Sequence, residues 1–502
     1  MESINLLIEG FQIAFTPINL FAAIFGAIIG LIVGAMPGIG GITGVALLLP
    51  LTFKVPPATA IICLAGLYYS TMYGGSFSAI LLNIPGDSPA IMTALDGYPL
   101  ARQGKAGKAL GTSIVSSFIG GTIGIIILTL GAPWLAEIGL KFGSPELALL
   151  ILFAMTSIGW LLGENVINGL IATGLGIVLA TIGVDQALGL SRFNFGQVNL
   201  FAGVPFIPLI IGMFGFSQVI EMVLQPDESA EGKIKFTIKE SLLKASEIKR
   251  ILPVALRQGF LGTFIGVMPG AGATTSSFLS YIFEKRINKN RDQIGKGAVE
   301  GIAAAESSNN AAAAGAFAPL LTLGIPGSST AAVLLGGLIM WGLRPGPLLF
   351  TNNPEFVWPL IASMYIGNII CLIIAFACIP ILVKAVSVPN SIMIPIISAI
   401  CIMAAYSANN AMFDVFFMIV IGTMSYFMGL AKIPTAPLLL AFVLTPMLEK
   451  YVRQSFDMTK GDISIFFRNG ICWTFIILTI VLCISPIITK RTATAKQKKE
   501  GE

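Results

Sequence analysis

The sequence predicts an all-α, polytopic membrane protein with roughly ten to twelve transmembrane helices in two structural repeats. Composition is the first reason: 55% of the 502 residues are hydrophobic and 11% are charged, whereas soluble domains are about 25% charged. The second is that apolar runs approaching the ~20 residues of a spanning helix recur along the chain, for example at 114–130 and 356–383. The third is a pair of proline–glycine motifs that occurs in each half in the same order.

The residue types exclude several classes of function. Histidine is absent, which removes the usual proton relay, the Ser–His dyad and histidine-ligated zinc. The six cysteines lie in apolar runs without metal-ligand spacing, so we expect them in the core and expect no cofactor. No stripe of arginine and lysine indicates nucleic acid, and no phosphate loop of ATP-driven proteins is present.

The first repeat begins with a predicted spanning helix at 11–34. It leads into Gly30-x-x-x-Gly34-Ala-Met-Pro-Gly38, in which glycines four residues apart allow close helix packing. Proline lacks an N–H group and clashes with the preceding turn, so the helix must break there. A short apolar run at 47–53 ends in a loop at Lys54–Pro57, and 58–72 is apolar again.

A second break is predicted at Asn83-Ile-Pro-Gly-Asp-Ser-Pro89. The run from Ser76 to Ile84 is too short to cross a bilayer, so we expect a broken or re-entrant hairpin with its tip at Pro85-Gly86. The basic loop that follows contains Arg102, Lys105 and Lys108, which favours the cytoplasmic side.

The rest of the first half contains further predicted spanning helices, and a polar connector separates the two halves. Spanning candidates at 114–130, 147–162 and 166–182 precede a polar segment in which lysine and arginine slightly outnumber acids, which favours the cytoplasm. We therefore divide the chain into a first membrane repeat at 1–225, a connector at 226–250, a second membrane repeat at 251–489 and a basic cytoplasmic tail at 490–502.

The second half repeats the opening pattern. Gly262-x-x-x-Gly266-Val-Met-Pro-Gly270 matches the first motif at an offset of 268 − 36 = 232, and Ile325-Pro-Gly-Ser-Ser329 matches the second at 326 − 85 = 241. Two motifs in the same order indicate an internal duplication, which is typical of transporters whose broken helices mark the binding site.

The distribution of basic residues predicts that the two repeats are inverted. Between its two breaks the first repeat has one lysine, Lys54, whereas the second has Lys285, Arg286, Lys289, Arg291 and Lys296. If basic loops lie inside, equivalent loops face opposite sides of the membrane.

Small polar residues gather at these breaks and at Glu306-Ser-Ser-Asn-Asn310, a cluster without a counterpart in the first half. A half-helix that follows a Pro-Gly break presents free N–H groups, which suit an anion, while unwound carbonyls and amides suit a small cation. The candidate substrate-binding residues are Ser76, Asn83, Gly86, Ser88, Thr274, Thr275, Ser308, Asn309, Asn310, Gly327, Ser328, Ser329 and Thr330. The candidate ion-coupling residues, for sodium or a proton, are Asp87, Glu306, Gly38 and Gly270.

Other interpretations of these residues stay open. Hydroxyl groups in membrane helices often bond their own backbone. Asp87 is also suited to cap a half-helix, and Glu306 to lie in the first turn after the cytoplasmic loop. An intramembrane hydrolase with Ser88 or Ser329 as nucleophile would have to use a Ser–Lys pair, since histidine is absent.

The chain closely resembles the large membrane subunit of the tripartite tricarboxylate transporters. The resemblance rests on Asn83–Pro89, Asp96-Gly-Tyr-Pro99, Met268–Gly272, Glu300–Asn310 and Leu323–Gly327. It implies a multi-pass permease of the bacterial inner membrane that works with a small four-helix membrane subunit and a periplasmic solute-binding protein. It also implies carboxylate uptake driven by an ion gradient, often of sodium. The alternative is a self-sufficient carboxylate or cation symporter without a binding protein.

Overall fold

The computed structural model describes residues 2–36, 39–161, 166–185, 189–224, 238–385 and 388–482. Helices dominate this part of the chain, and its only strands are β1 (Gly183–Val184) and β2 (Ser191–Arg192). The predicted helical class is therefore confirmed. Gly38, residues 226–237 of the connector at 226–250 and the tail at 490–502 lie outside the described residues.

Seven helices among the described residues are long and apolar enough to cross a membrane, where the sequence predicted roughly ten to twelve. They are Pro17–Ala35, Ser88–Gly139, Phe206–Leu224, Pro354–Ala377, Asn390–Asn409, Met412–Leu430 and Thr435–Thr459. Other apolar helices, such as Gly40–Lys54 and Ser329–Met340, are shorter because the chain breaks beside them.

The helices pack into two compact units. Unit 1 consists of Met1–Glu137 with Pro205–Phe427, and unit 2 of Ile138–Val204 with Met428–Glu502. Both pairs of proline–glycine motifs belong to unit 1. The packing units therefore differ from the sequence repeats, because unit 1 takes helices from both halves of the chain.

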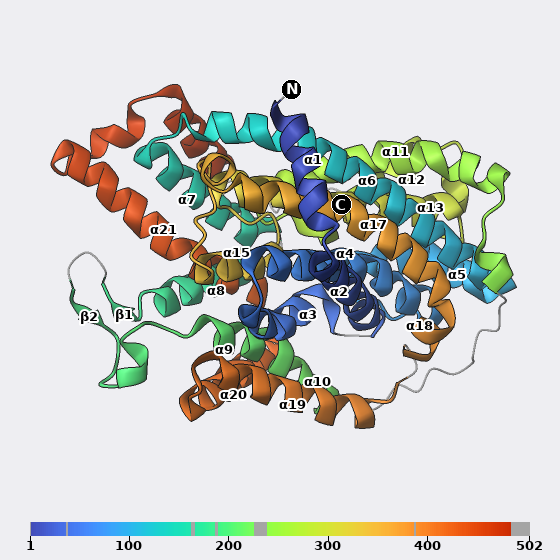
Figure 1. Cartoon of the computed structure of the whole chain (residues 1–502), viewed down its shortest axis with the longest axis horizontal. Helices are drawn as coiled ribbons and strands as arrows, with labels where there is room; N and C mark the ends of the chain where they lie inside the picture. The colour runs from blue at the N-terminus through green and yellow to red at the C-terminus, as the bar shows by residue number, and fades with distance from the viewer. Residues whose placement is uncertain are drawn as a thin grey trace, which may run out of the picture. The chain divides into compact units, whose positions relative to one another are not determined.

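Within unit 1, both halves of the chain supply helices, which Figure 1 labels. The first half contributes α1 (Glu2–Ala14), α2 (Pro17–Ala35), α3 (Gly40–Leu48), α4 (Pro57–Leu82), α5 (Ile91–Leu100) and α6 (Ala106–Gly139). The second half contributes α11 (Ala245–Val267), α12 (Gly272–Ile287), α13 (Val299–Gly315), α14 (Phe317–Leu323), α15 (Ser329–Met340) and α17 (Pro354–Ala377). The further helices of this unit are α9 (Phe206–Ile210), α10 (Ser217–Leu224), α16 (Leu349–Asn352), α18 (Ile379–Ala385), α19 (Asn390–Asn409) and α20 (Met412–Leu430).

Matched glycines bring matched helices together. A Cβ on Gly34 of α2 would lie 2.4 Å from the carbonyl oxygen of Thr71 in α4, and a Cβ on Gly266 of α11 would lie 2.3 Å from that of Ala312 in α13. The offsets are those of the sequence motifs, since 34 + 232 = 266 and 71 + 241 = 312. The duplication therefore extends from the motifs to the packing of α2 on α4 and of α11 on α13.

The backbone at the second break is also duplicated. The residue that follows α4 is Asn83, with a φ of 61°, and the residue that follows α14 is Gly324, with a φ of 69°. The two positions correspond, since 83 + 241 = 324. One expectation was wrong, because Ser76 does not begin a separate short segment. α4 is continuous from Pro57 to Leu82, since apolar contacts along its whole length bury it.

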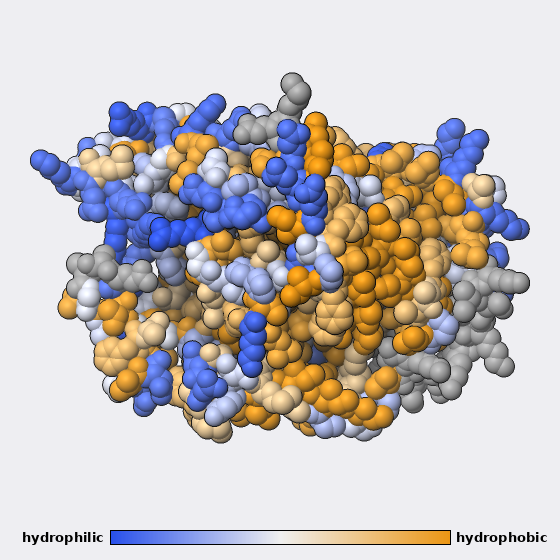
Figure 2. All heavy atoms as spheres, viewed as in Figure 1, coloured by the Kyte–Doolittle hydropathy of each residue, from blue (hydrophilic) through white to orange (hydrophobic). Residues whose placement is uncertain are grey.

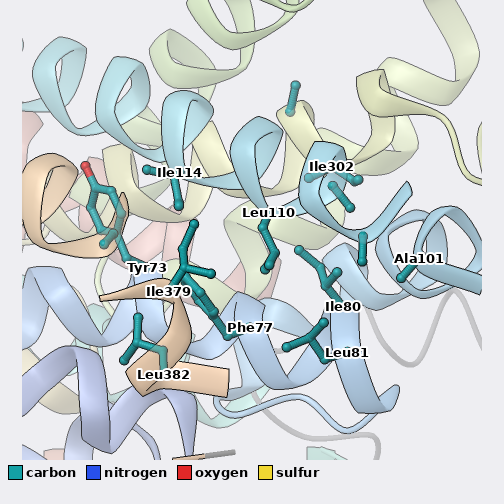
Figure 3. Packing of buried hydrophobic residues seen from close by; sticks show 14 of the residues in the cluster. Tyr73, Phe77, Ile80, Leu81, Ala101, Leu110, Ile114, Ile302, Ile379 and Leu382 are labelled. Carbon is teal, nitrogen blue, oxygen red and sulfur yellow. The ribbon is translucent and has the colours of Figure 1, made fainter. Parts of the chain in front are cut away.

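The core of unit 1 surrounds α4. Tyr73, Phe77 and Ile80 of α4 pack with Leu110 and Ile114 of α6, Ile302 of α13, and Ile379 and Leu382 of α18 (Figure 3). Close packing of this kind holds side chains in fixed rotamers. The polar groups that α4, α6 and α13 carry further along are therefore held on rigid supports.

The described surface is rich in exposed apolar side chains, and Figure 2 shows hydrophobic residues covering much of the visible face. Examples are Phe21 of α2 and Phe260 and Phe264 of α11, which are more than half exposed. Exposed apolar area of this extent is typical of surfaces that contact lipid or another protein.

Unit 2 contains α7 (Ser144–Leu161), α8 (Val166–Ala180), the β1–β2 hairpin, α21 (Thr435–Thr459) and a helix at Gly470–Leu482. An ion network fixes the hairpin to α21. Arg453 donates to Asp185 at 2.5 Å and to Glu449 at 2.6 Å, and Arg192 donates to Glu449 at 2.8 Å. The polar linker around Asp185 and Arg192 therefore has a structural role, because it is held to α21 by ion pairs.

Candidate functional site

Asp87 lies at the second break of the first half, where it binds the N-terminus of α3. Its Oδ2 accepts the N–H of Gly41 at 2.9 Å, and its Oδ1 accepts the N–H of Ser88 at 2.8 Å. Gly40 has a φ of 54°, and a Cβ there would lie 3.1 Å from Asp87 Oδ1. A carboxylate is favourable at this position because the first N–H groups of a helix lack backbone partners and carry partial positive charge. The expectation that Asp87 could act as a cap is therefore confirmed.

Ser328 lies at the equivalent break of the second half, since 87 + 241 = 328. Its Oγ accepts the N–H of Ala331 at 3.1 Å and so caps α15. The same Oγ lies 3.0 Å from the hydroxyl oxygen of Tyr68, which comes from α4 of the first half. The N–H of Gly272, at the start of α12, donates to the carbonyl of Gly327 at 3.1 Å. The second break therefore joins α12 and α15 to a helix of the other repeat.

Glu306 is fully buried in the middle of α13, which excludes the interpretation that it lies in the first turn of that helix. It accepts hydrogen bonds from Thr93 of α5 and, at 2.9 Å, from Ser117 of α6. Ser113 of α6 donates to Ser76 of α4 at 2.6 Å. No lysine or arginine pairs with Glu306 among the described residues. A buried carboxylate of this kind requires hydrogen bonds, a proton or a bound cation.

Asn309 and Asn310 lie next to Glu306 on α13 and are fully buried. The amide Nδ2 of Asn310 donates to the carbonyl of Glu306 at 3.0 Å and to Oδ1 of Asn309 at 2.6 Å. The side chain of Asn309 is also within hydrogen-bonding reach of the Glu306 carboxylate, whereas Asn310 Oδ1 has no hydrogen-bond partner within the described part of the chain. Such a group costs free energy when buried, so an acceptor is available here for a ligand or water.

The other predicted substrate residues fall into three groups. Ser329 and Thr330 are buried in the first turn of α15, and Thr274 and Thr275 are half-buried in the first turn of α12. Asn83 and Ser88 are exposed on the outside of their turn. The hydroxyls of Ser76 and Ser308 donate to their own helices, to the carbonyls of Tyr73 and Ala305, as the structural interpretation of the hydroxyls expected.

The predicted glycines support backbone contacts. A Cβ on Gly86 would lie 2.0 Å from the carbonyl oxygen of Gly34, and one on Gly327 would lie 2.5 Å from that of Gly266. Gly270 has a φ of 74°, a conformation that favours glycine. These residues shape the breaks, while Gly38 is outside the described residues.

Sequence reasoning missed Tyr68, Thr93, Ser113 and Ser117. Ser113 and Ser117 are four residues apart, the spacing of one helix face, so two hydroxyls pointing the same way could have been read from the sequence. Tyr68 could have been found from the duplication, because 68 + 241 = 309 makes it the counterpart of Asn309. By the same offset Tyr69 matches Asn310, so tyrosines occupy the positions equivalent to the two amides. Thr93 gave no comparable signal.

Asp96 has a structural role beside the site. Its Oδ1 accepts N–H groups from Gly295, Gly297 and Ala298 at 2.7–2.8 Å, and its Oδ2 accepts the hydroxyl of Tyr281 at 2.8 Å. The carboxylate therefore fixes the loop between α12 and α13 to α5. Among the described residues, neither Ser88 nor Ser329 is hydrogen-bonded to a lysine.

Comparison with known proteins adds a family. A family model described as the tripartite tricarboxylate transporter TctA family matches residues 20–440. An uncharacterized 52.8 kDa protein in the TAR-I ttuC' 3' region of Agrobacterium vitis is 38% identical over 495 residues, which cover 98% of each chain. An uncharacterized protein in the TAR-II ttuC' 3' region of the same organism is 39% identical over 233 residues, 46% of this chain and 96% of that one. No solved structure matches significantly.

Proposed function

The chain belongs to the tripartite tricarboxylate transporter TctA family, and we propose on that basis that it is the permease subunit of a binding-protein-dependent secondary transporter. Its substrates would be tricarboxylates or other carboxylates, and import would be driven by an ion gradient. The family implies a tricarboxylate transporter subunit; the dependence on a binding protein and the driving ion are our proposals.

One observation carries the proposal: two polar helix breaks, one from each repeat, come together in an apolar protein. Tyr68 of α4 in the first repeat contacts Ser328 at the break of the second, and the turn at Ser88–Ala90 of the first repeat packs on α12 of the second. The first turns of α12 and α15 present N–H groups and hydroxyl groups. Such N-termini bind carboxylates without a buried arginine. An anionic substrate held between two related halves would be exposed to either side when the halves move.

We propose that Glu306 binds the coupling ion. Its hydrogen-bond partners Thr93 and Ser117 are hydroxyls, and the unpartnered Oδ1 of Asn310 is a further oxygen from the next turn of the same helix. Oxygen ligands of this kind suit sodium, and the same carboxylate can carry a proton. Asp87 was also a candidate for coupling, but both of its oxygens already accept N–H groups.

We further propose that the repeats are inverted. α15 packs on α3, while the equivalent first-half turn at Ser88–Ala90 packs on α12, the counterpart of α3. Reciprocal packing of this kind is what a two-fold relation between halves produces. With the single Lys54 in one loop and five basic residues in its equivalent, the axis would lie in the membrane plane.

The partners we propose are a small four-helix membrane subunit, which would cover part of the exposed apolar surface, and a periplasmic solute-binding protein, which would deliver the carboxylate. The location would be the bacterial inner membrane. Each follows from the family and from the apolar surface.

Carboxylate uptake into proteoliposomes tests the coupling assignment. Sodium is replaced at constant pH and membrane potential, and the proton gradient is then removed at constant sodium. Loss of uptake in one arm identifies the ion, and uptake unchanged in both arms would remove ion coupling. Glu306→Gln is expected to abolish ion-driven accumulation and to keep carboxylate binding. Glu355→Gln, an exposed glutamate at the start of α17, is the matched control and is expected to behave as wild type.

A further inference from the structure

Helix α5 is attached to α13 at two points, and both attachments are made by polar side chains. Thr93 donates a hydrogen bond to the carboxylate of Glu306, in the middle of α13. Asp96 is three residues later and therefore on the same face of α5; its Oδ1 accepts N–H groups at 2.7–2.8 Å from the loop that leads into α13. Thr93 and Asp96 are both fully buried. One short helix therefore bonds both the proposed ion site and the loop between α12 and α13.

The backbone of this loop is shaped to receive a carboxylate. Gly295 and Gly297 have φ angles of 96° and 103°, which favour glycine and let the N–H groups of the loop converge on Asp96 Oδ1. The other carboxylate oxygen accepts the hydroxyl of Tyr281 in α12 at 2.8 Å. Gly301, in the first turn of α13, leaves room for this carboxylate, because a Cβ there would overlap Asp96 Oδ2. Charge-assisted hydrogen bonds in this number make a strong and directional attachment.

The apolar contacts of α5 fix its position less firmly. The helix is ten residues long, and Ala94 packs in a small cluster with Ala79 of α4, side chains that bury little area. Met92 packs beside Tyr281 and so adds to the attachment that Asp96 makes. Apolar contacts are not directional, whereas hydrogen bonds are. The register of α5 along α13 is therefore set by its polar side chains.

We propose that Asp96 is a positioning residue for the ion site: it holds α5 on α13 so that the hydroxyl of Thr93 reaches Glu306. If the loop between α12 and α13 moves away from Asp96, α5 is released and ion binding at Glu306 is weakened. Ion binding at Glu306 in turn favours the arrangement in which Asp96 holds the loop, because coupling between two sites is reciprocal. This inference rests on the proposed role of Glu306 in binding the coupling ion, and it adds a residue that acts on the ion through another side chain.

The ion dependence of uptake tests the proposal. Uptake of labelled citrate is measured in proteoliposomes that contain the full-length chain and its proposed partners. Sodium is titrated against choline at constant pH and membrane potential, and in a second series the external pH is varied at constant sodium and membrane potential. Thr93→Val keeps the shape of the side chain without its hydroxyl, and it should raise the half-saturating concentration of the driving ion about tenfold. Asp96→Ala should raise it by a similar factor, although Asp96 bonds the loop and Tyr281 rather than Glu306.

Two comparisons separate positioning from a general loss of stability. Thr93→Val combined with Asp96→Ala should raise the half-saturating ion concentration no further than the larger single change, because both act through one hydrogen bond. Glu300→Gln is the matched control, since Glu300 is a buried carboxylate that ties the start of α13 to Arg250 of α11 rather than to α5. It should lower the melting temperature and keep the half-saturating ion concentration within about twofold of wild type.

Tyr281→Phe covers the case in which Asp96→Ala does not fold. It removes only the hydroxyl that Asp96 Oδ2 accepts, and it should raise the half-saturating ion concentration about threefold. Wild-type ion dependence in Asp96→Ala, or in Tyr281→Phe in its place, would overturn the assignment, as would additive effects in the double variant. Failure of the proposed function would look different, because Glu306→Gln would then itself keep ion-driven accumulation.

Discussion

Asp87 and Glu306 are both carboxylates in an apolar unit, yet their surroundings give them different chemistry. Asp87 accepts N–H groups from Gly41 and Ser88, so its charge is stabilised by a helix start and a turn. Glu306 accepts hydroxyls of Thr93 and Ser117, which can rotate and can also donate to or accept from a bound ion. The surroundings of Asp87 suit a carboxylate that stays charged, whereas those of Glu306 suit a carboxylate that binds and releases an ion.

Asp87→Asn should abolish uptake while leaving membrane insertion intact. The amide keeps the size of the side chain but puts a donor where two N–H groups already point, so α3 loses its anion and about 0.5–2 kcal/mol of stabilisation. Uptake by reconstituted protein and the melting temperature in detergent check both parts. Asp462→Asn removes a similar cap at an exposed position of unit 2 and should leave uptake unchanged. Normal transport by Asp87→Asn would count against a site at these breaks.

Sequence could identify the polar residues of the site but not which of them meet. Glu306, Asn309 and Asn310 stood out because polar groups are costly in an apolar chain. Tyr68 did not stand out, because a tyrosine in an apolar run is ordinary until the duplication pairs it with Asn309. The contact between Tyr68 and Ser328 joins residues 260 positions apart, and no local pattern encodes such a distance.

Among the helices, the glycine motifs were recognisable, but their partners were not. The Gly30–Gly34 and Gly262–Gly266 spacings predicted close packing. Only the structure shows that the partners are α4 and α13, in matched registers. Hydropathy also does not identify α4 and α13 as membrane-spanning helices. α4 is 26 residues long but carries Tyr68, Ser70, Thr71, Tyr73, Ser76 and Ser78, and is absent from the seven apolar helices described.

Gly34→Ala and Gly266→Ala should each destabilise unit 1 by about 1–3 kcal/mol, because a Cβ would meet backbone atoms of the partner helix that cannot move away. Thermal unfolding of the purified protein measures this. Gly367→Ala in α17 is the matched control: it is a buried helical glycine whose Cβ would meet nothing within 4 Å. It should be neutral or slightly stabilising, since alanine favours helix by about 1 kcal/mol. If all three substitutions change the stability equally, then Gly34 and Gly266 are not needed for close helix packing.

For the whole molecule, the repeats could be predicted from sequence but the units could not. The repeats follow from two offsets, 232 and 241. Unit 2 instead combines α7 and α8 with α21, helices that share no motif and are separated by more than 250 residues. Their association depends on side-chain contacts such as Arg453 with Asp185, which the sequence presents only as scattered charges.

Inversion of the repeats predicts that equivalent loops face opposite sides of the membrane. Val55 lies in the loop after α3, and Lys289 lies in the equivalent loop after α12; both are exposed. In a variant without the six native cysteines, Val55→Cys should react with an impermeant thiol reagent added from the periplasmic side. Lys289→Cys should react only from the cytoplasmic side. Labelling of both from one side would show parallel repeats.

If the chain is the carboxylate permease of a binding-protein-dependent transporter, its uptake activity should depend on the binding protein. Proteoliposomes containing this chain and its small membrane subunit are given an ion gradient and labelled carboxylate, with or without the periplasmic solute-binding protein. We predict uptake only when the binding protein is present, and none when Asp87→Asn replaces the wild-type chain. Uptake that continues at the same rate without the binding protein would show that the chain is a self-sufficient symporter instead.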